Sequence, residues 1–84
     1  MNKYIITVLT KDRPGIIAHV TRVLFEQGCN LENVNQMILQ NQFAGLFVVE
    51  APASLDKDRL HRTLSGQSED QGLVIHVNTL EETD

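Results

Sequence analysis

The sequence predicts an α+β fold, a four-stranded antiparallel sheet built in the order strand, helix, strand, strand, helix, strand, with both helices on one face. Two observations lead to this prediction. Apolar residues repeat at helical spacing in two segments, whereas four other segments are β-branched, aromatic or alternating. Their order gives two split βαβ units, which interleave through right-handed connections into a sheet of this kind.

The composition limits the possible functions. The chain has 84 residues, a formal net charge of −4, one cysteine and no tryptophan. We expect one domain over residues 1–84, and a chain of this size hides only about 60–65% of its unfolded surface, so a partner would add to a marginal core. A single cysteine excludes disulfide scaffolds and cysteine-rich zinc sites. The acidic balance argues against direct nucleic-acid binding.

The apolar runs are short. The first, residues 4–9, is too short for a signal peptide, and no later run approaches the roughly 18 residues that a membrane span needs. We therefore expect a cytoplasmic protein that does not interact with a membrane.

The first strand and the first helix have the strongest patterns. Residues 4–9 are apolar on both faces and end at a turn-forming cluster, which predicts a central strand. Pro14 suits the first helical position, where its missing N–H would be unpaired anyway, and Asp12 could cap the first turn. Gly28 fits the left-handed position after the helix. The apolar stripe of the helix consists of Ile16, Ile17, Val20, Val23 and Leu24.

The next two segments form a predicted hairpin. In residues 30–40 the apolar Leu31 and Val34 are three apart, which a bulge or an edge position would explain. Asn41 and Gln42 are expected to form the turn. Residues 43–49 then return as a second central strand, in which Gly45 indicates a close backbone approach or a bulge.

The last two elements are less distinctive. Ser54 can cap a short second helix that ends by Gly66, and residues 73–78 alternate as in a strand with one buried face. The apolar residues of this helix are Leu55, Leu60 and Leu64.

Two central strands that are apolar on both faces indicate that the chain associates with another surface. In a monomer the face without helices would meet water. We therefore expect that something covers this face or that the sheet is extended, and we predict an oligomer.

This arrangement is the ferredoxin-like fold, which carries unrelated functions, so the function must be inferred from a site. Metal chaperones of this architecture need paired thiolates on the first loop, and the sole thiol here is Cys29. RNA-binding sheets need a glycine-aromatic-basic run on the exposed face, which is missing around Phe43 and Phe47. Arg13 without a nucleophile and base is not a catalytic set. We expect no enzymatic activity and no cofactor.

The histidines and the cysteine are expected to play no chemical role. His19 is predicted to point away from the apolar stripe, His61 to lie on a polar helix face and His76 to point outward, with no ligand at metal-binding spacing. Cys29 follows a helix end and is expected to be a small apolar filler.

Two motifs nevertheless resemble those of a known family. Asp12-Arg13-Pro14-Gly15 followed by an apolar pair, an amphipathic helix, and then Gly28-Cys29-Asn30-Leu31 are similar to the motifs of ACT domains. The likeness covers nearly the whole chain. The Pro-Gly loop also resembles that of the N-terminal modules of formyltetrahydrofolate hydrolases and of small proteins related to glycine-cleavage repressors.

The resemblance implies a non-enzymatic regulatory domain that senses a small ligand, usually an amino acid, between two associated domains. With this resemblance we expect a homodimer whose sheets join side by side. Its implied site residues here are Asp12, Arg13, Gly15, Ile16, Asn30 and Leu31. The amides of Gly15 and Ile16 lie in the first helical turn, where a carboxylate can bind, and Asp12 could bind an α-ammonium group. The family commonly has asparagine at the position of Asp12, so aspartate here keeps an acceptor and loses a donor.

Other interpretations of the same residues stay open. Asp12 can cap the helix, Pro14-Gly15 can make a tight turn and Asn30 can adopt a left-handed conformation, all without a ligand. The chain is then a ligand-free module that dimerises or docks on a metabolic enzyme or a transcription regulator. Phe25 lies off the apolar stripe and is a candidate contact residue for that function.

Overall fold

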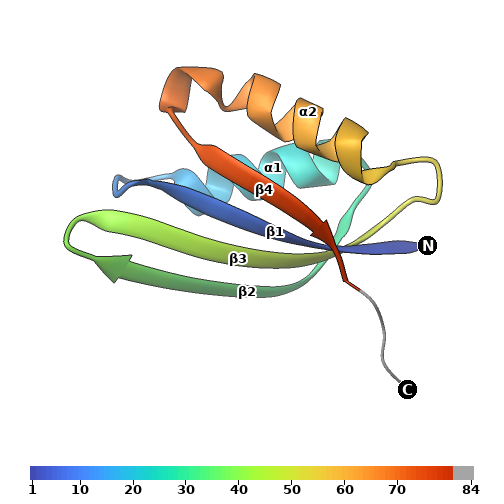
Figure 1. The fold of residues 1–84 in the computed structure, drawn as a ribbon, viewed down its shortest axis with the longest axis horizontal. Coiled ribbons are helices and arrows are strands. Elements are labelled where there is room, and N and C mark those ends of the chain that lie inside the picture. Colours follow the sequence, from blue (N-terminus) through green and yellow to red (C-terminus); the bar gives the residue numbers. More distant parts are fainter. Residues whose placement is uncertain (81–84) are drawn as a thin grey trace.

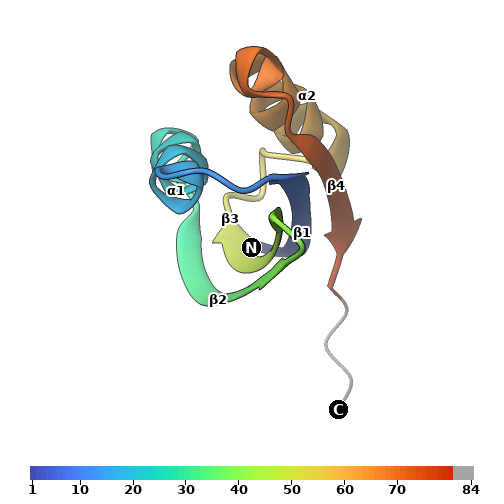
Figure 2. The ribbon, with the colours of Figure 1, turned by 90° about the vertical axis from the view of Figure 1, so that its left-hand side faces the viewer.

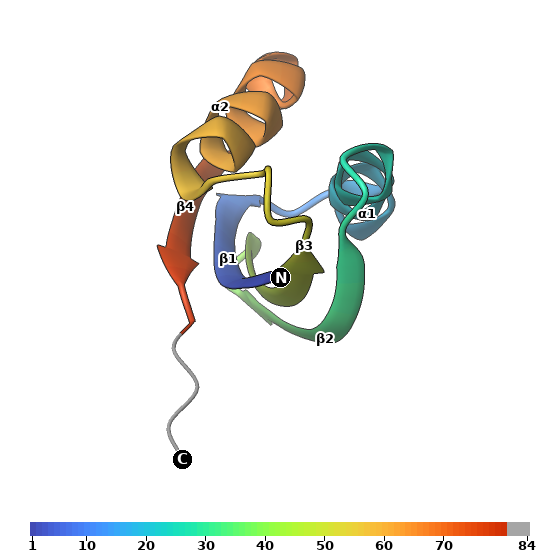
Figure 3. The ribbon, with the colours of Figure 1, turned by 90° about the vertical axis from the view of Figure 1, so that its right-hand side faces the viewer.

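A computed structural model describes residues 1–80 and confirms the predicted order of elements (Figure 1). The two helices lie on the same side of a single sheet (Figures 2 and 3). A short 3-10 turn, η1, which the sequence pattern did not reveal, precedes the last strand. The elements are β1 (Asn2–Lys11), α1 (Ile16–Glu26), β2 (Asn30–Leu39), β3 (Gln42–Ala51), α2 (Lys57–Gln67), η1 (Glu69–Gln71) and β4 (Val74–Thr79).

The strand order is β2-β3-β1-β4, and all neighbouring strands are antiparallel. As predicted, β1 and β3 lie in the middle. α1 contacts β2 and α2 contacts β4, so each helix lies towards one edge of the sheet. We call the helix-bearing side of the sheet the covered face and the opposite side the open face.

The core lies between the covered face and the helices. Alternate residues of the central strands point into it, and Ile6, Val8, Phe47 and Val49 are completely buried there. From the helices, Val20, Val23, Leu60 and Leu64 are also completely buried. The intervening residues of the same strands lie on the open face.

The C-terminal end of α1 follows the sequence prediction. Gly28 has a φ of 79°, and the amides of Gly28 and Cys29 donate to the carbonyls of Phe25 and Leu24, each at 3.0 Å. These two bonds form a Schellman motif, which favours glycine at the left-handed position. The predicted irregularity of β2 is confirmed as a register shift between Leu31 and Asn33.

The starts of both helices differ from the prediction. Pro14 does not begin α1, because Gly15 precedes the helix with a left-handed φ of 90° and Ile16 is the first helical residue. The second helix is capped by Asp56, whose carboxylate accepts from the amide of Arg59 at 2.8 Å, and not by Ser54. Leu55 is therefore buried just before the helix.

The hairpin turn is shifted by one residue. Gln40 and Asn41, with φ of 53° and 66°, occupy the turn, and Gln42 already pairs with Leu39. Two central residues with positive φ fit the right-handed twist of a two-residue hairpin. No helix within residues 1–80 is long and apolar enough to cross a membrane.

Candidate functional site

A depression of about 270 Å³ opens at the start of α1, and we call it the α1 depression. Four of the six residues that sequence analysis selected border it, namely Asp12, Arg13, Gly15 and Ile16. The other lining residues are Ile17, Ala18, Gln36, Ile38 and Phe43. The motif loop, the first helical turn and the end of the β2–β3 hairpin therefore meet at one place.

The backbone of the motif loop explains its glycine. A Cβ added to Gly15 would meet nothing within 4 Å, so the positive φ is what requires glycine there, not crowding. The amide of Asp12 donates to the carbonyl of Asn41 at 2.8 Å, which fixes the loop against the hairpin. The loop is therefore held in one conformation beside the α1 depression.

The N-terminus of α1 carries no side-chain cap. The expectation that Asp12 could cap the helix is therefore wrong, because the left-handed Gly15 occupies the capping position. The side chain of Asp12 is exposed at the border of the α1 depression. The first turn of a helix leaves backbone N–H groups without intrahelical partners, and these groups lie at the positive end of the helix.

Arg13 has a structural contact that the sequence did not indicate. Its guanidinium donates to the backbone carbonyl of Gln71, which lies in η1. The half-buried arginine thus ties the motif loop to the connection between α2 and β4. Arginine keeps four more N–H donors after this contact.

Asn30 and Leu31 do not line the α1 depression. They begin β2, whereas the depression uses Gln36 and Ile38 near its other end, roughly 17–26 Å further along an extended strand. Leu31 is half-buried against the core, and Asn30 is exposed. Within residues 1–80 the only non-glycine residues with positive φ are Gln40 and Asn41. Asn30 therefore does not adopt the left-handed conformation that one interpretation of the sequence expected.

The expectation for His19 is wrong, because its side chain is buried, with 9% exposed. Helical periodicity showed only the side of α1 that faces the sheet, whereas η1 and the end of α2 cover a second side. Arg22 Nη2 and Gln71 Nε2 each lie 3.3 Å from His19 Nδ1. Because a guanidinium only donates, Nδ1 accepts, and Nε2–H donates to Ser68 Oγ at 3.0 Å.

The remaining histidines and the cysteine differ among themselves. His61 is half-buried, and its Nε2–H donates to the carbonyl of Ile75 at 2.9 Å, whereas His76 is exposed as predicted. Cys29 is buried, and burial raises the pKa of its thiol, which fits the predicted filler role. Within residues 1–80 no three His, Cys, Asp or Glu side chains are grouped so that they could hold a metal ion.

Gln36, Ile38 and Phe43 were missed by sequence analysis. They reach the α1 depression only because the β2–β3 hairpin folds alongside the motif loop. The alternation of side chains along β2 and β3 was the one available signal that these three residues lie on the same face. Gln36 pairs with Gly45 and Ile38 pairs with Phe43, which places all three on the covered face.

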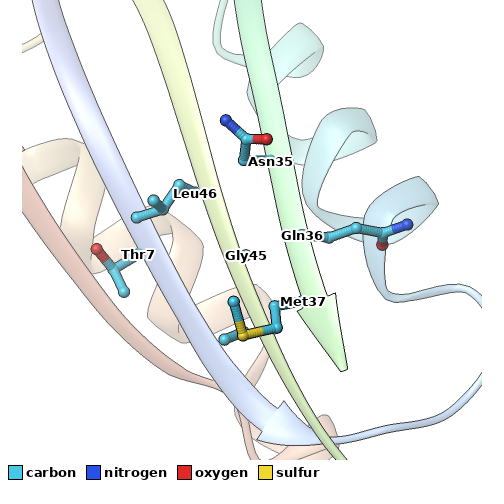
Figure 4. Close-up of a pocket in the computed structure, with 7 residues that line it drawn as sticks. Thr7, Asn35, Gln36, Met37, Gly45 and Leu46 are labelled. Atoms are coloured by element: carbon cyan, nitrogen blue, oxygen red, sulfur yellow. The ribbon is translucent and has the colours of Figure 1, made fainter. Parts of the chain in front are cut away.

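A second depression, of about 440 Å³, lies on the open face. Its lining includes Thr7, Asn35, Met37, Ala44 and Leu46. Figure 4 shows Thr7, Leu46 and Met37 on the near side of the sheet, while Gln36 extends away from them. We call it the open-face depression.

Comparison with known proteins agrees with the fold. A UPF0237 protein of Methanopyrus kandleri is 32% identical over 78 residues, which are 92% of this chain and 87% of that protein. The structure of an ACT domain protein from Streptococcus pneumoniae superimposes with a TM-score of 0.84 at 28% identity, over 93% of this chain and 89% of that one.

A further structure, described as a putative glycine cleavage system transcriptional repressor, has the same fold, with a TM-score of 0.84 at 24% identity. This match covers 99% of this chain and 48% of that one. The sequence profile of the ACT domain matches residues 3–78. The chain therefore belongs to the ACT domain family.

Proposed function

We propose that this ACT domain is a non-catalytic sensor that binds an amino acid or a related small carboxylate in the α1 depression and regulates a separate metabolic enzyme or transcription regulator. ACT domains are typically ligand-binding regulatory domains. The observation that carries the proposal is the uncapped start of α1, which faces a depression bordered by an exposed carboxylate. We propose the cytoplasm as its location.

The chemistry of the depression suits a zwitterion. The unpaired amides of the first helical turn can bind a carboxylate, and the positive end of the helix favours it. Asp12 can bind the α-ammonium group, since its carboxylate caps nothing in α1. Ile38 and Phe43 offer apolar contacts to a small side chain.

A homodimer would bring Asn30 and Leu31 into the same site. β2 is an edge strand of ten residues, and an exposed edge presents unpaired N–H and C=O groups. If two copies pair antiparallel about the middle of β2, the start of the strand in one copy lies beside its end in the other. The side chain of Leu31, which shares the covered face with Val49, and the backbone of Asn30 in a second copy then approach the α1 depression, which explains why one chain alone keeps the two motifs apart.

Phe25 supports the use of this edge. It lies on α1, the helix that contacts β2, and 62% of the side chain is exposed. Two-fold pairing through β2 brings the two α1 helices towards each other, so that Phe25 can be buried between copies. The alternative function, a ligand-free interaction module, is favoured by the same exposed ring.

Thermal-shift measurements with the twenty amino acids, followed by titration calorimetry, test the sensor. A ligand at about 100 times its Kd should add about 2.7 kcal/mol to the stability. Asp12→Ala should abolish the shift, whereas Asp58→Ala, which removes an exposed carboxylate on α2, should preserve it. If no amino acid or related carboxylate shifts the melting temperature, the sensor proposal fails, and co-purification with an untagged partner then tests the interaction module.

Sedimentation equilibrium tests the edge dimer. Phe25→Asp should weaken association through the β2 edge while the chain stays folded, and Ser54→Asp, which adds the same charge to an exposed loop, should not. An unchanged sedimentation profile for Phe25→Asp would remove the edge dimer from the proposal.

A further inference from the structure

The open face carries an apolar row that crosses all four strands. The register pairs Val74 with Leu9, Leu9 with Ala44, and Ala44 with Met37, so these four side chains lie in one line from β4 to β2. Leu9 is 44% exposed, Val74 53% and Met37 58%. A contiguous apolar band on a sheet face marks an association surface, whereas scattered apolar residues do not.

The next two rows have apolar or small residues in the middle and polar residues at the edges. One row consists of His76, Thr7, Leu46 and Asn35, and the other of Asn78, Ile5, Val48 and Asn33. The open-face depression lies among the first two rows, between the short side chains of Thr7 and Ala44 and the longer ones of Leu46 and Met37. The face is therefore uneven in a way that a matching surface could fill.

We propose that the open face binds the open face of a second copy, so that two sheets stack into a β-sandwich. Sheets pack face to face about 10 Å apart with strand directions within about 30° of each other. We place the two-fold axis parallel to the strands, over the gap between β1 and β3. Each β1 then lies opposite β3 of the other copy, and each β4 lies opposite β2.

A second copy of the chain fits this face because the side chains of the face complement one another across the two-fold axis. In this arrangement Leu9 faces Ala44 and Val74 faces Met37, so large side chains meet smaller ones. By the same operation Leu46 faces Thr7.

The residues of the edge strands and of the far end of the sheet also face complementary residues of the second copy. His76 faces Asn35 and Asn78 faces Asn33, so polar groups meet polar groups at the rim. At the far end of the sheet, Lys3 and Glu50 are register partners, and the two-fold axis places each opposite the other residue type. On the two central strands no like charges are brought together, since Lys11 faces Gln42.

The size of the face fits as well. Four strands of up to ten residues cover roughly 600 Å² in projection, at about 4.8 Å between strands and 3.3 Å per residue. A stable interface buries about 800 Å² of accessible surface per partner, and the accessible area of an uneven face exceeds its projection. This surface is separate from the β2 edge, so the proposal does not depend on the edge dimer or on a ligand.

Thiol cross-linking tests the predicted pairing. Met37 and Val74 of one chain lie on opposite edge strands, about 14 Å apart across the sheet, whereas Met37 of one copy faces Val74 of the other across the gap of about 10 Å between the sheets. This gap is too wide for a disulfide, so the double variant Met37→Cys/Val74→Cys is treated with a short bismaleimide that reaches across it, and a covalent dimer should appear on a denaturing gel. Each single variant is the control, and the buried Cys29 should stay unreacted. A double variant that cross-links no more than the single variants overturns the proposal.

Sedimentation equilibrium provides the second measurement. Leu46→Lys should weaken face association about a hundredfold, because the residue lies near the centre of the interface and is changed in both copies. Ala53→Lys, an exposed loop position, should leave it unchanged, and circular dichroism should show that both variants fold. If Leu46→Lys leaves the association constant unchanged while Phe25→Asp lowers it, the edge is the only self-interface and the face proposal is wrong.

Discussion

The two faces of this sheet are built from the same strands and differ in what their apolar residues can contribute. Phe47 and Leu46 are neighbours in β3, yet Phe47 is completely buried on the covered face and Leu46 is 43% exposed on the open face. The covered face stabilises the single chain, because its apolar area is already removed from water. The open face can contribute only when something is placed on it. When a strand is apolar on both sides, one side therefore contributes to the stability of the folded chain and the other to the stability of an assembly.

The largest expected effect separates the faces directly. Phe47→Ala should lower the free energy of unfolding by about 3–5 kcal/mol, because it leaves a cavity in the closed core. Leu46→Ala should cost less than about 1 kcal/mol in the dissociated chain, since the side chain is already half in water. Urea unfolding at low protein concentration measures both. Equal losses would contradict the distinction between the faces.

Gly45 sharpens the comparison within the covered face. A Cβ there would lie 2.8 Å from Cε1 of Phe43 and 3.1 Å from Cε1 of Phe47. Gly45→Ala should therefore destabilise the chain by about 1–3 kcal/mol through displacement of the two rings. The neighbouring change Ala44→Ser, on the open face, should stay within about 0.5 kcal/mol. Thermal unfolding of the two variants checks this, and a neutral Gly45→Ala would show that the rings move freely.

This glycine also shows what sequence patterns can and cannot predict. Close approach at Gly45 was one of two predicted explanations, and the uninterrupted pairing of β3 with β1 and β2 around it excludes the other, a bulge. Aromatic rings, not backbone, are what approach it. Alternation and turn residues predicted the fold because these signals are local and each strand shows its own period.

The candidate site was less predictable because it depends on contacts between distant segments. The motif loop selected Asp12, Arg13, Gly15 and Ile16, which do meet at one depression. Nothing local indicated that Arg13 would bind the carbonyl of Gln71, or that His19 would be buried against Ser68. A helical wheel shows which side faces the sheet, but not which loop covers another side.

The polar contacts above the core should have an effect no larger than that of Gly45→Ala. Ser68 is completely buried, and its hydroxyl accepts from His19 Nε2–H. Ser68→Ala leaves that donor without a partner and should cost about 1–3 kcal/mol. Ser54→Ala, at an exposed loop position, is the matched control and should be neutral. Chemical denaturation at neutral pH measures the difference, and equal stabilities would show that water replaces the lost acceptor.

The smallest effect is expected at Tyr4, whose buried hydroxyl donates to the carbonyl of Leu55 at 2.8 Å. Asn2 Nδ2 donates to the same carbonyl at 3.3 Å, so Tyr4→Phe leaves the acceptor paired and should cost only about 1 kcal/mol.

Burial raises the pKa of Tyr4 above its ordinary 10.0, so folding favours the neutral phenol. That contribution is complete below pH 10.0 and is lost as the pH rises through the folded-state pKa. The advantage of the native chain over Tyr4→Phe should therefore be constant from neutral pH to pH 9 and shrink in more alkaline solution. Paired urea titrations at a series of pH values measure it, and a difference that grows with alkalinity would mean that the folded chain stabilises the phenolate.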